Sequence, residues 1–464
     1  PVPGNPLAVS ELDWSVYRGG TQHTGASRAI VGTPLHEVWK WESGQPFAPT
    51  APTTAGGLVF LAGDDGVVRA LDAATGTLQW TYTTAGPILQ PPTLWEGRAY
   101  VGSGDGHVYA LDAATGRLLW RFRAAPVERR IMVYGRLAST WPVNSGIVVH
   151  DGVVYCAAGI IDFDGTYVHA LDAETGAPIW ENAETGHLDP ELRKGVSAQG
   201  RLTILGDRLY LAAGNVVPPA PYDLASGAYS GADPGEGVPR TNRGEELGVF
   251  ADRFLVQGGR LSYSAIEPIV SPGHFVLWQS ATRAIPFAAG RTAPVWDDAL
   301  AVFTPERERP PVGYRASQVA AVLEDADASG LPAPTWTCEA LEESETVGLA
   351  LAENAVVALC ETPNYRSLFP RYRVCVLSRD DGTLLCDHNL PAEARPNGLA
   401  IDADGRILAA LTNGGVACLA GEEALGVYLD ALARLAAEGD ESTRNNAVAR
   451  RIQDVRTLYV ELFL

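Results

Sequence analysis

A hairpin signature that occurs three times constrains the fold of this chain more than any other feature of its sequence. The copies, which align without gaps, are VRALDAATGTLQW (Val68 to Trp80), VYALDAATGRLLW (Val108 to Trp120) and VHALDAETGAPIW (Val168 to Trp180). In each copy an alternating apolar strand leads into a turn whose Gly can adopt a positive φ, and a second strand then ends on Trp. A further strand and a Gly-rich turn precede every copy. One repeat therefore supplies about four short strands.

Four strands over about 40 residues are typical of one blade of a β-propeller. A blade cannot bury both of its faces alone, so neighbouring blades must stack. We expect the aromatic residue that ends each repeat to pack one blade against the next. The residues to which we assign this docking role are Trp39, Trp80, Trp120 and Trp180. Trp39 lies in HEVWKW (36–41), in register with Trp120 but with no repeat before it, and closure of the ring by this strand explains its position.

Weaker copies of the repeat continue to Leu419. They predict an all-β propeller of four-stranded antiparallel blades, eight in number, with seven as the alternative because the fifth and sixth blades are poorly marked. The predicted division is an N-terminal segment (1–35), a propeller (36–420) closed by the 36–41 strand, and a C-terminal helical segment (421–464). In that last segment leucines at helical spacing and the polar break EGDEST predict a short helical hairpin.

Charge and hydropathy narrow the classes of partner. A formal net charge of −20 makes nucleic acid and anionic membrane surfaces poor partners, because phosphate binding needs clustered Lys and Arg. No apolar run is long enough to span a bilayer. The chain opens at Pro1 without an initiator Met or a signal-peptide pattern, so we expect either a mature secreted chain or a fragment of a longer one.

The LDAATGxxxW hairpins, together with WSVYRGGTQHTGAS (14–27), resemble the repeats of pyrroloquinoline-quinone-like propeller proteins. That family includes quinoprotein alcohol dehydrogenases and outer-membrane assembly lipoproteins of the BamB type. The resemblance covers Trp14 to Leu419 and implies a propeller fold and a bacterial, extracytoplasmic protein, whether periplasmic, outer-membrane-associated or secreted. It does not imply one function, because many such propellers hold no cofactor.

The resemblance also implies where a quinone and its Ca²⁺ would bind in a dehydrogenase. Asn215, in LYLAAGNVVPP, matches the family's Asn ligand, but Ile161 stands where the family has a Glu, with Asp162 one residue further on. An Ile cannot ligate Ca²⁺, and a shift of one residue on a strand turns a side chain to the other face. No counterpart of the catalytic Asp or of the adjacent-cysteine pair is found. We therefore predict no catalytic residue and no cofactor, and a metal held by Asp162 and Asn215 belongs only to the alternative.

An insertion of about twenty residues between the second and third repeats is rich in Arg and aromatic residues. Such a loop can surround an anionic or planar ligand, or it can satisfy loop carbonyls and pack across the seams between blades. Both interpretations remain open. The candidate ligand-binding residues are Arg129, Tyr134, Arg136, Trp141, Asn144 and Asn215.

Six cysteines occur, without metal-ligand or haem-attachment spacing. Cys375 and Cys386 lie on the two strands of one hairpin, where a cross-strand disulfide is geometrically plausible. Two buried free thiols are the alternative. Cys338 with Cys360 is a weaker second pair.

Three functions remain in competition. The first is a non-catalytic, extracytoplasmic scaffold that binds a protein or a small ligand in the cell envelope, indicated by a well-kept blade framework beside a degenerate quinone site. The second is a quinoprotein dehydrogenase with relocated ligands, dependent on pyrroloquinoline quinone and Ca²⁺. The third is a sensing module of a larger multidomain protein. The first is our prediction.

Overall fold

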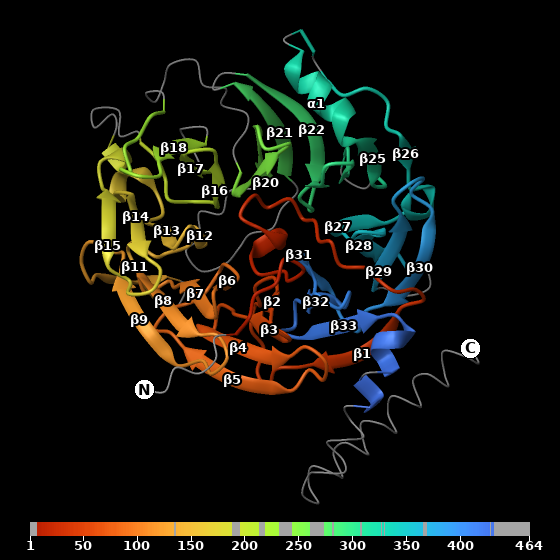
Figure 1. Ribbon diagram of the computed structural model, residues 1–464, viewed down its shortest axis with the longest axis horizontal. Coiled ribbons are helices and arrows are strands. Elements are labelled where there is room, and N and C mark those ends of the chain that lie inside the picture. The colour runs from red at the N-terminus through yellow and green to blue at the C-terminus, as the bar shows by residue number, and fades with distance from the viewer. Residues whose placement is uncertain are drawn as a thin grey trace, which may run out of the picture.

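The structure is a computed structural model, and Figure 1 shows its sheets arranged around a central axis. It describes residues 7–133, 136–187, 195–212, 219–231, 244–259, 273–280, 283–306, 309–325, 327–328, 330–364, 369–426 and 428–430.

The first four sheets follow the order of the chain around the ring. The first is formed by β2 (Thr53–Ala55), β3 (Leu58–Leu61), β4 (Val67–Asp72) and β5 (Leu78–Thr83); the second by β6 (Thr93–Trp95), β7 (Arg98–Gly102), β8 (His107–Asp112) and β9 (Leu118–Arg123); the third by β12 (Val148–His150), β13 (Val153–Ala158), β14 (Tyr167–Asp172) and β15 (Pro178–Asn182); and the fourth by β16 (Leu202–Leu205), β17 (Arg208–Leu211) and β18 (Ala220–Asp223). A separate hairpin of β10 (Arg130–Val133) and β11 (Arg136–Ser139) lies between the second and third blades in the chain.

The remaining sheets complete the ring. The fifth is formed by β19 (Glu246–Phe250), β20 (Phe254–Gly259), β21 (Gly273–Ser280) and β22 (Arg283–Gly290); the sixth by β23 (Val295–Trp296), β24 (Leu300–Phe303), β25 (Val312–Arg315) and β26 (Trp336–Thr337); the seventh by β27 (Glu345–Leu351), β28 (Ala355–Thr362), β29 (Arg371–Ser378) and β30 (Leu384–Asn389); and the eighth by β31 (Ala394–Ile401), β32 (Ile407–Leu411), β33 (Val416–Ala420) and β1 (His36–Trp41). The prediction of an eight-bladed, antiparallel propeller is confirmed, and the seven-bladed alternative is dropped.

Strand β1 closes the ring by pairing antiparallel with β33. Trp39 lies opposite Cys418, and a register irregularity separates Glu37 from Trp39. The eighth blade therefore takes its outer strand from the beginning of the chain and its three inner strands from the end. This arrangement joins the two ends of the propeller by a ladder of main-chain hydrogen bonds.

Short helices occur in the segments that connect or precede the strands. They are η1 (Tyr17–Gly19), η2 (Asp162–Asp164), η3 (Thr185–His187), α1 (Ala316–Glu324) and η4 (Glu339–Leu341). Residues 422–426 and 428–430 are also helical, and Tyr428 is buried against the core of the eighth blade. The rest of the predicted C-terminal hairpin lies outside the described residues. Among the described helices, none has the length and hydropathy to cross a membrane.

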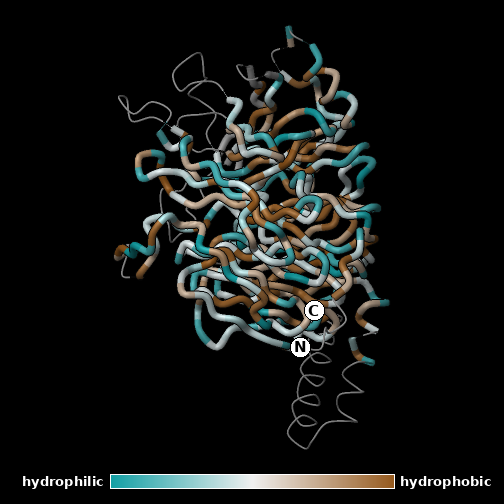
Figure 2. The backbone as a smooth tube through the Cα atoms, turned by 60° about the vertical axis from the view of Figure 1, so that its left-hand side comes forward, coloured by the Kyte–Doolittle hydropathy of each residue, from teal (hydrophilic) through white to brown (hydrophobic). Residues whose placement is uncertain are grey.

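Burial falls from the axis to the rim of each blade. All five residues of β32 are buried, whereas on the outer strand β5 exposed residues alternate with partly buried ones. In Figure 2, hydrophobic residues are concentrated in the interior of the body. Continuous apolar runs are typical of strands covered on both faces, and alternation is typical of strands with one face in water.

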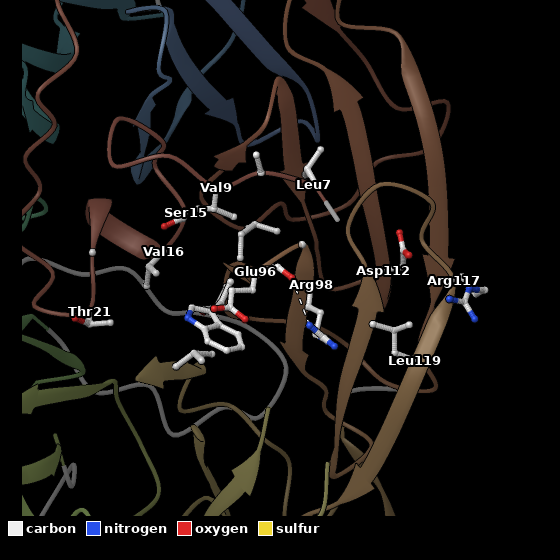
Figure 3. Close-up of a pocket in the computed structure, with 17 residues that line it drawn as sticks. Leu7, Val9, Ser15, Val16, Thr21, Glu96, Arg98, Asp112, Arg117 and Leu119 are labelled. Atoms are coloured by element: carbon white, nitrogen blue, oxygen red, sulfur yellow. Dashed lines mark hydrogen bonds between the residues drawn. The ribbon is translucent and has the colours of Figure 1, made fainter. Parts of the chain in front are cut away.

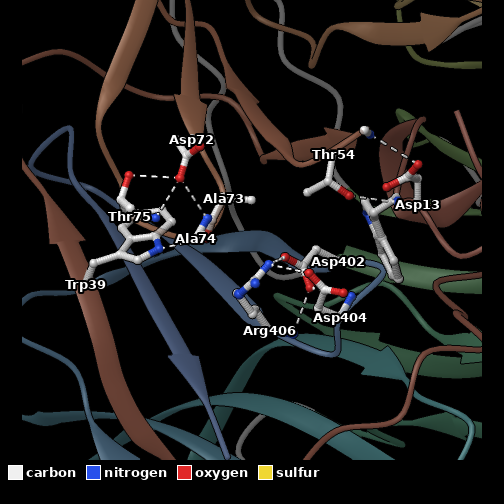
Figure 4. Close-up of polar contacts among 12 residues, drawn as sticks. Asp13, Trp39, Thr54, Asp72, Ala73, Ala74, Thr75, Asp402, Asp404 and Arg406 are labelled. Atoms are coloured by element: carbon white, nitrogen blue, oxygen red, sulfur yellow. Dashed lines mark hydrogen bonds and ion pairs between the residues drawn. The ribbon is translucent and has the colours of Figure 1, made fainter. Parts of the chain in front are cut away.

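The LDAATG turn forms because its side chains satisfy its own backbone. Asp72 accepts hydrogen bonds at one oxygen from the backbone N–H and the hydroxyl of Thr75, both at 2.8 Å (Figure 4). Gly76 follows with a φ of 68°, a conformation that favours Gly. Asp112, Asp172 and Asp223 make the corresponding backbone bonds in the next three blades.

Each predicted docking tryptophan lies over the hairpin Gly of the following blade. Trp39 donates its indole N–H to the carbonyl of Ala73 at 2.8 Å, and a Cβ built on Gly76 would lie 2.6 Å from the Trp39 ring. The same pairing joins Trp80 to Gly116, Trp120 to Gly176, and Trp180 to Gly227. The indole thus buries its ring and satisfies its N–H at the seam between two blades.

A fifth docking tryptophan was not identified from the sequence. Trp336 donates to the carbonyl of Arg379 at 3.0 Å and covers Gly382 of the seventh blade. No LDAxTG turn precedes Trp336, so the repeat pattern gives no reason to single it out. The sequence signal for Trp336 lies in the seventh blade, where the DDG turn places Gly382 at the hairpin position. A Gly at this position leaves room for an aromatic ring from the preceding blade.

The predicted disulfide between Cys375 and Cys386 is wrong, because all six cysteines are free. Cys386 pairs with Val376 on β29, while Cys375 pairs with Asp387. Neighbouring residues of a strand point to opposite faces, so this register sends the two thiols apart. Cys375 belongs to the core between the sixth and seventh blades, whereas Cys386 packs toward the eighth. The second predicted pair, Cys338 and Cys360, is also unbonded.

Thiol titration checks this correction. In denaturant without reductant, a thiol-reactive dye is expected to label all six cysteines of the chain. In the folded protein only Cys386, the one that is not fully buried, is expected to react quickly. Two missing thiols in denaturant that are recovered by reduction would contradict the register described above.

Candidate functional site

The axis of the ring is filled by the N-terminal segment. Between positions 14 and 29 its backbone carbonyls accept hydrogen bonds from six of the eight blades in turn. The acceptor–donor pairs are Trp14 with Thr54, Ser15 with Leu94, Thr21 with the Thr203 hydroxyl, Gln22 with Val249, Thr24 with Trp296, and Gly25 with Leu351, all at 2.8–2.9 Å. Figure 1 shows this red segment, which includes η1, at the centre of the ring. The segment therefore lies against the inner strands of these six blades.

A buried ion pair anchors the segment. Arg201, which precedes β16, binds Glu246 at the start of β19 with 3.1 Å between Nε and Oε2. The hydroxyl of Tyr17 donates to the same carboxylate at 3.0 Å, and the Arg201 guanidinium stacks on the Tyr17 ring, 3.3 Å from its centroid. Gln90 of the second blade accepts a further hydrogen bond from Arg201. This axial cluster joins the N-terminal segment to three blades.

Burial and neighbouring charge set the protonation of the cluster. Burial raises the pKa of Glu246, but the cations of Arg201 and Arg18 outweigh it and leave that pKa below its ordinary value. Burial also raises the pKa of Tyr17 far above its ordinary value. The cluster is therefore a carboxylate held by guanidinium groups, with a phenol that stays protonated.

Arg18 and His23 also belong to the axial cluster, and both have a positive φ, 56° and 54°. Arg18 donates to the carbonyl of Pro294, and its guanidinium lies 5.5 Å from the centre of the Trp296 ring. His23 Nδ1 lies 2.7 Å from the Leu247 carbonyl, a geometry that requires the proton on Nδ1. Burial lowers the pKa of His23 to about 4, assisted by the Arg201 cation.

The depressed pKa of His23 predicts a pH dependence of stability. Between the ordinary value of 6.5 and about 4, the unfolded chain binds a proton that the folded chain does not, so stability falls as the pH falls. Across this pH range the protonation of His23 in the unfolded chain lowers the free energy of unfolding by about 3 kcal/mol in total. His23→Asn keeps the left-handed backbone and an N–H donor, and it is expected to remove up to one proton from the slope of unfolding free energy against pH.

Urea unfolding at several pH values measures this slope. His150→Asn, at a partly exposed position of the third blade, is the matched control and is expected to keep the wild-type slope. Glu246 contributes in the same direction at lower pH in both variants, because its carboxylate is held ionised by Arg201. Equal slopes for the two variants would contradict the assignment to His23.

Two of the predicted ligand-binding residues of the insertion, Arg129 and Trp141, make packing contacts and hydrogen bonds within the protein. Arg129 donates to the Thr140 hydroxyl at 3.0 Å, and its guanidinium lies 5.1 Å from the Trp141 ring. Trp141 is buried and donates to the carbonyl of Asp164 at 2.5 Å. Asn144 is partly buried on the loop before β12. These contacts match the alternative in which Arg and aromatic residues pack the seam between blades.

Other predicted residues cannot be placed in the site. Tyr134 and Asn215 lie outside the described residues, and of Arg136, at the start of β11, only the backbone is described. The structure therefore brings Arg129 and Trp141 together but does not assemble the six candidates into one pocket.

Asp162, the carboxylate named for the alternative calcium site, lies in η2. It is buried in η2, where burial raises the pKa of its carboxyl group and backbone N–H groups, including that of Gly195, oppose the shift. Ile161 caps this short helix and offers no oxygen ligand from its side chain. Among the described residues, no group of three or more His, Cys, Asp and Glu side chains is placed to hold a metal ion. Calcium prefers six to eight oxygen ligands, and of the two residues named for the alternative only Asp162 is described.

A cleft of about 920 Å³ lies between the N-terminal segment and the second blade (Figure 3). Its lining combines apolar side chains with a few charged ones. The apolar residues include Leu7, Val9, Val16, Trp95 and Leu119, and the charged ones are Glu96, Arg98, Asp112 and Arg117. Sequence reasoning missed this cleft, because its walls come from segments that are distant in the chain. Its size suits a small molecule.

Comparison with known proteins relates the chain to two groups. A family model described as outer membrane protein assembly factor BamB matches residues 36–214. The quinoprotein alcohol dehydrogenase PedE of Pseudomonas putida is 36% identical over 85 residues, which are 18% of this chain and 14% of PedE. The chain thus matches only a small part of the length of that relative.

Solved structures extend the similarity to the whole ring. The quinohemoprotein alcohol dehydrogenase from Comamonas testosteroni superposes with a TM-score of 0.55 at 14% identity, covering 89% of this chain and 82% of that one. A europium-containing methanol dehydrogenase gives a TM-score of 0.57 at 10% identity, with 89% and 98% covered. At these identities the likeness concerns the fold alone.

Proposed function

Because the chain is a pyrroloquinoline-quinone-like β-propeller, we propose that it is a non-catalytic scaffold that binds a protein partner or a small ligand outside the cytoplasm. The observation that carries this proposal is the filled axis. Residues 14–29 accept hydrogen bonds from six blades, and the cavity lined by Tyr17 and Arg201 has a volume of about 10 Å³. Such a volume holds about one water molecule and no quinone.

Two further observations support a binding role. The axial groups hold each other, because Tyr17, Arg201 and Glu246 bind one another rather than facing open space. Two described surfaces have room for a partner: the cleft between the N-terminal segment and the second blade, and the hairpin that follows this blade. The similarity to the BamB family model supports a place in the cell envelope. We propose no cofactor.

Reconstitution with pyrroloquinoline quinone and Ca²⁺ tests the proposal. We expect no quinone absorbance to remain with the protein after dialysis, and no alcohol-dependent reduction of an electron-accepting dye above buffer. PedE, treated in the same way, is the positive control for the assay.

Saturable quinone binding with alcohol oxidation would overturn the scaffold and favour a dehydrogenase with relocated ligands. Asp162→Asn then decides where those ligands lie. This variant removes the carboxylate next to Ile161, the position expected for a calcium ligand, so loss of the activity in it would locate the ion at η2.

A further inference from the structure

The hairpin β10–β11 stands apart from the blades. Its strands pair with each other, Met132 opposite Leu137 and Ile131 opposite Ala138, and neither pairs with any other strand in the described part of the chain. Within the described residues, both outer edges of this two-stranded sheet therefore have main-chain groups that no other strand pairs with. Such an edge accepts an additional strand readily.

Exposed apolar side chains concentrate on this hairpin. Twelve large apolar side chains are exposed among the described residues, and four of them lie within the eleven residues from 127 to 137. These four are Val127, Ile131, Met132 and Leu137. Met132 and Leu137 are directly opposite each other, 66% and 53% exposed, so they form one apolar surface on the same face. An exposed patch of this kind marks an interaction site.

The stretch of sequence that contains the hairpin has a net charge opposite in sign to that of the whole chain. Residues 117–136 contain six arginines and one acidic residue, Glu128, a net charge of +5 within a chain whose net charge is −20. The six are Arg117, Arg121, Arg123, Arg129, Arg130 and Arg136. The charge of this segment therefore favours an acidic partner, although the net charge of the whole chain is negative.

The root of the hairpin is held firmly. Ser139 N–H donates to the Gly104 carbonyl at 2.7 Å, and Thr140 N–H donates to the Arg129 carbonyl at 3.0 Å. Arg129 and Trp141 then fasten this root to η2 through the contacts described above. A fixed root presents the strands in one orientation, which reduces the entropy lost on binding.

We propose that β10–β11 docks an extended acidic segment of a partner protein. The segment adds to the hairpin as a third strand, with apolar side chains against Met132 and Leu137 and carboxylates toward arginines of the hairpin such as Arg130. This inference rests on the proposed scaffold function and names the surface and the chemistry of its partner.

A single NMR signal reports on the hairpin, because Met132 is the only methionine of the chain. The full chain labelled with [methyl-¹³C]methionine is titrated with an acetylated peptide of about nine alternating Glu and Val residues, long enough to pair along one edge. We expect the methyl signal to move and saturate with the acidic peptide, and the affinity to fall with added salt. The matched peptide, with Lys in place of Glu, is expected to leave the signal unmoved.

Two variants of equal exposure locate the surface. Leu137 on β11 is 53% exposed, and Leu385 on β30 of the seventh blade is 51% exposed. Leu137→Glu is expected to weaken binding of the acidic peptide about tenfold. Leu385→Glu is expected to change it less than about twofold. Both substitutions are on exposed strand faces, so both variants are expected to fold.

Four results would overturn the inference: no movement of the methyl signal, equal movement with the Lys peptide, equal loss in the two variants, or self-association of the chain through this hairpin without peptide. The last result would assign the hairpin to a second copy of the chain. A failed titration leaves the quinone experiment unaffected, so the failure of this inference is distinguishable from failure of the proposed function.

Discussion

Arg201→Met is expected to lower the free energy of unfolding by about 3–5 kcal/mol, because it leaves the carboxylate of Glu246 buried without its cation. Both side chains are nearly enclosed, with 13% and 14% of their surface exposed. The variant also removes the guanidinium that stacks on Tyr17 and the donor to Gln90. Equilibrium unfolding in urea, followed by tryptophan fluorescence, measures the loss.

The double variant Arg201→Met with Glu246→Leu is the control. It removes both charges together, so we expect it to recover a large part of the stability lost in the single variant. If the single substitution costs less than about 1 kcal/mol, in the range of a surface ion pair, the axial cluster does not anchor the N-terminal segment. If the double variant is no more stable than Arg201→Met, the loss arises from packing on Tyr17 and not from the unpaired carboxylate.

Gly116→Ala is expected to lower the free energy of unfolding by about 2–4 kcal/mol. The new Cβ would lie 2.5 Å from the ring of Trp80, and the backbone has a φ of 70°. Either the indole leaves its place over the turn, losing its hydrogen bond to the Ala113 carbonyl, or the second blade shifts away from the first. Thermal and urea unfolding measure the effect.

Gly57→Ala separates the clash from the cost of backbone conformation. Gly57 has a similar φ of 78°, but a Cβ there meets nothing within 4 Å. We expect this variant to lose only about 1 kcal/mol. Equal losses at the two positions would mean that Trp80 does not need close contact with Gly116, and that the seam between these blades is held by other groups.

The sequence predicts those parts of the fold that repeat and are local. The bonds that shape the first LDAATG turn join Asp72 to Thr75 and Gly76, within five residues. The docking of Trp80 on Gly116 follows from the repeat itself, because each copy supplies one half of the contact to each neighbour. Closure by strand 36–41 follows in the same way, since Trp39 has no preceding copy.

The candidate site was only partly predictable. The insertion rich in Arg and aromatic residues was recognised from its composition, and its Arg129 and Trp141 do lie together. The exposure of Met132 and Leu137 on the hairpin inside this insertion could not be predicted from the sequence. Apolar residues in a strand are buried more often than not. The disulfide prediction failed for a related reason, because the pairing of Cys386 with Val376 places the two thiols on opposite faces.

The sequence by itself determined the blade, the order of blades and the contact that joins them. These depend on short-range turns and on a repeat in which each copy supplies the Trp for one neighbouring blade and the Gly for the other. Only the tertiary structure decided what occupies the axis. Tyr17 reaches Glu246 across 229 residues of chain, and no periodic pattern relates the two positions. Closing the ring brings the inner strands of all blades to one place, and the side chains that meet there are set by the closure and not by their spacing in the sequence.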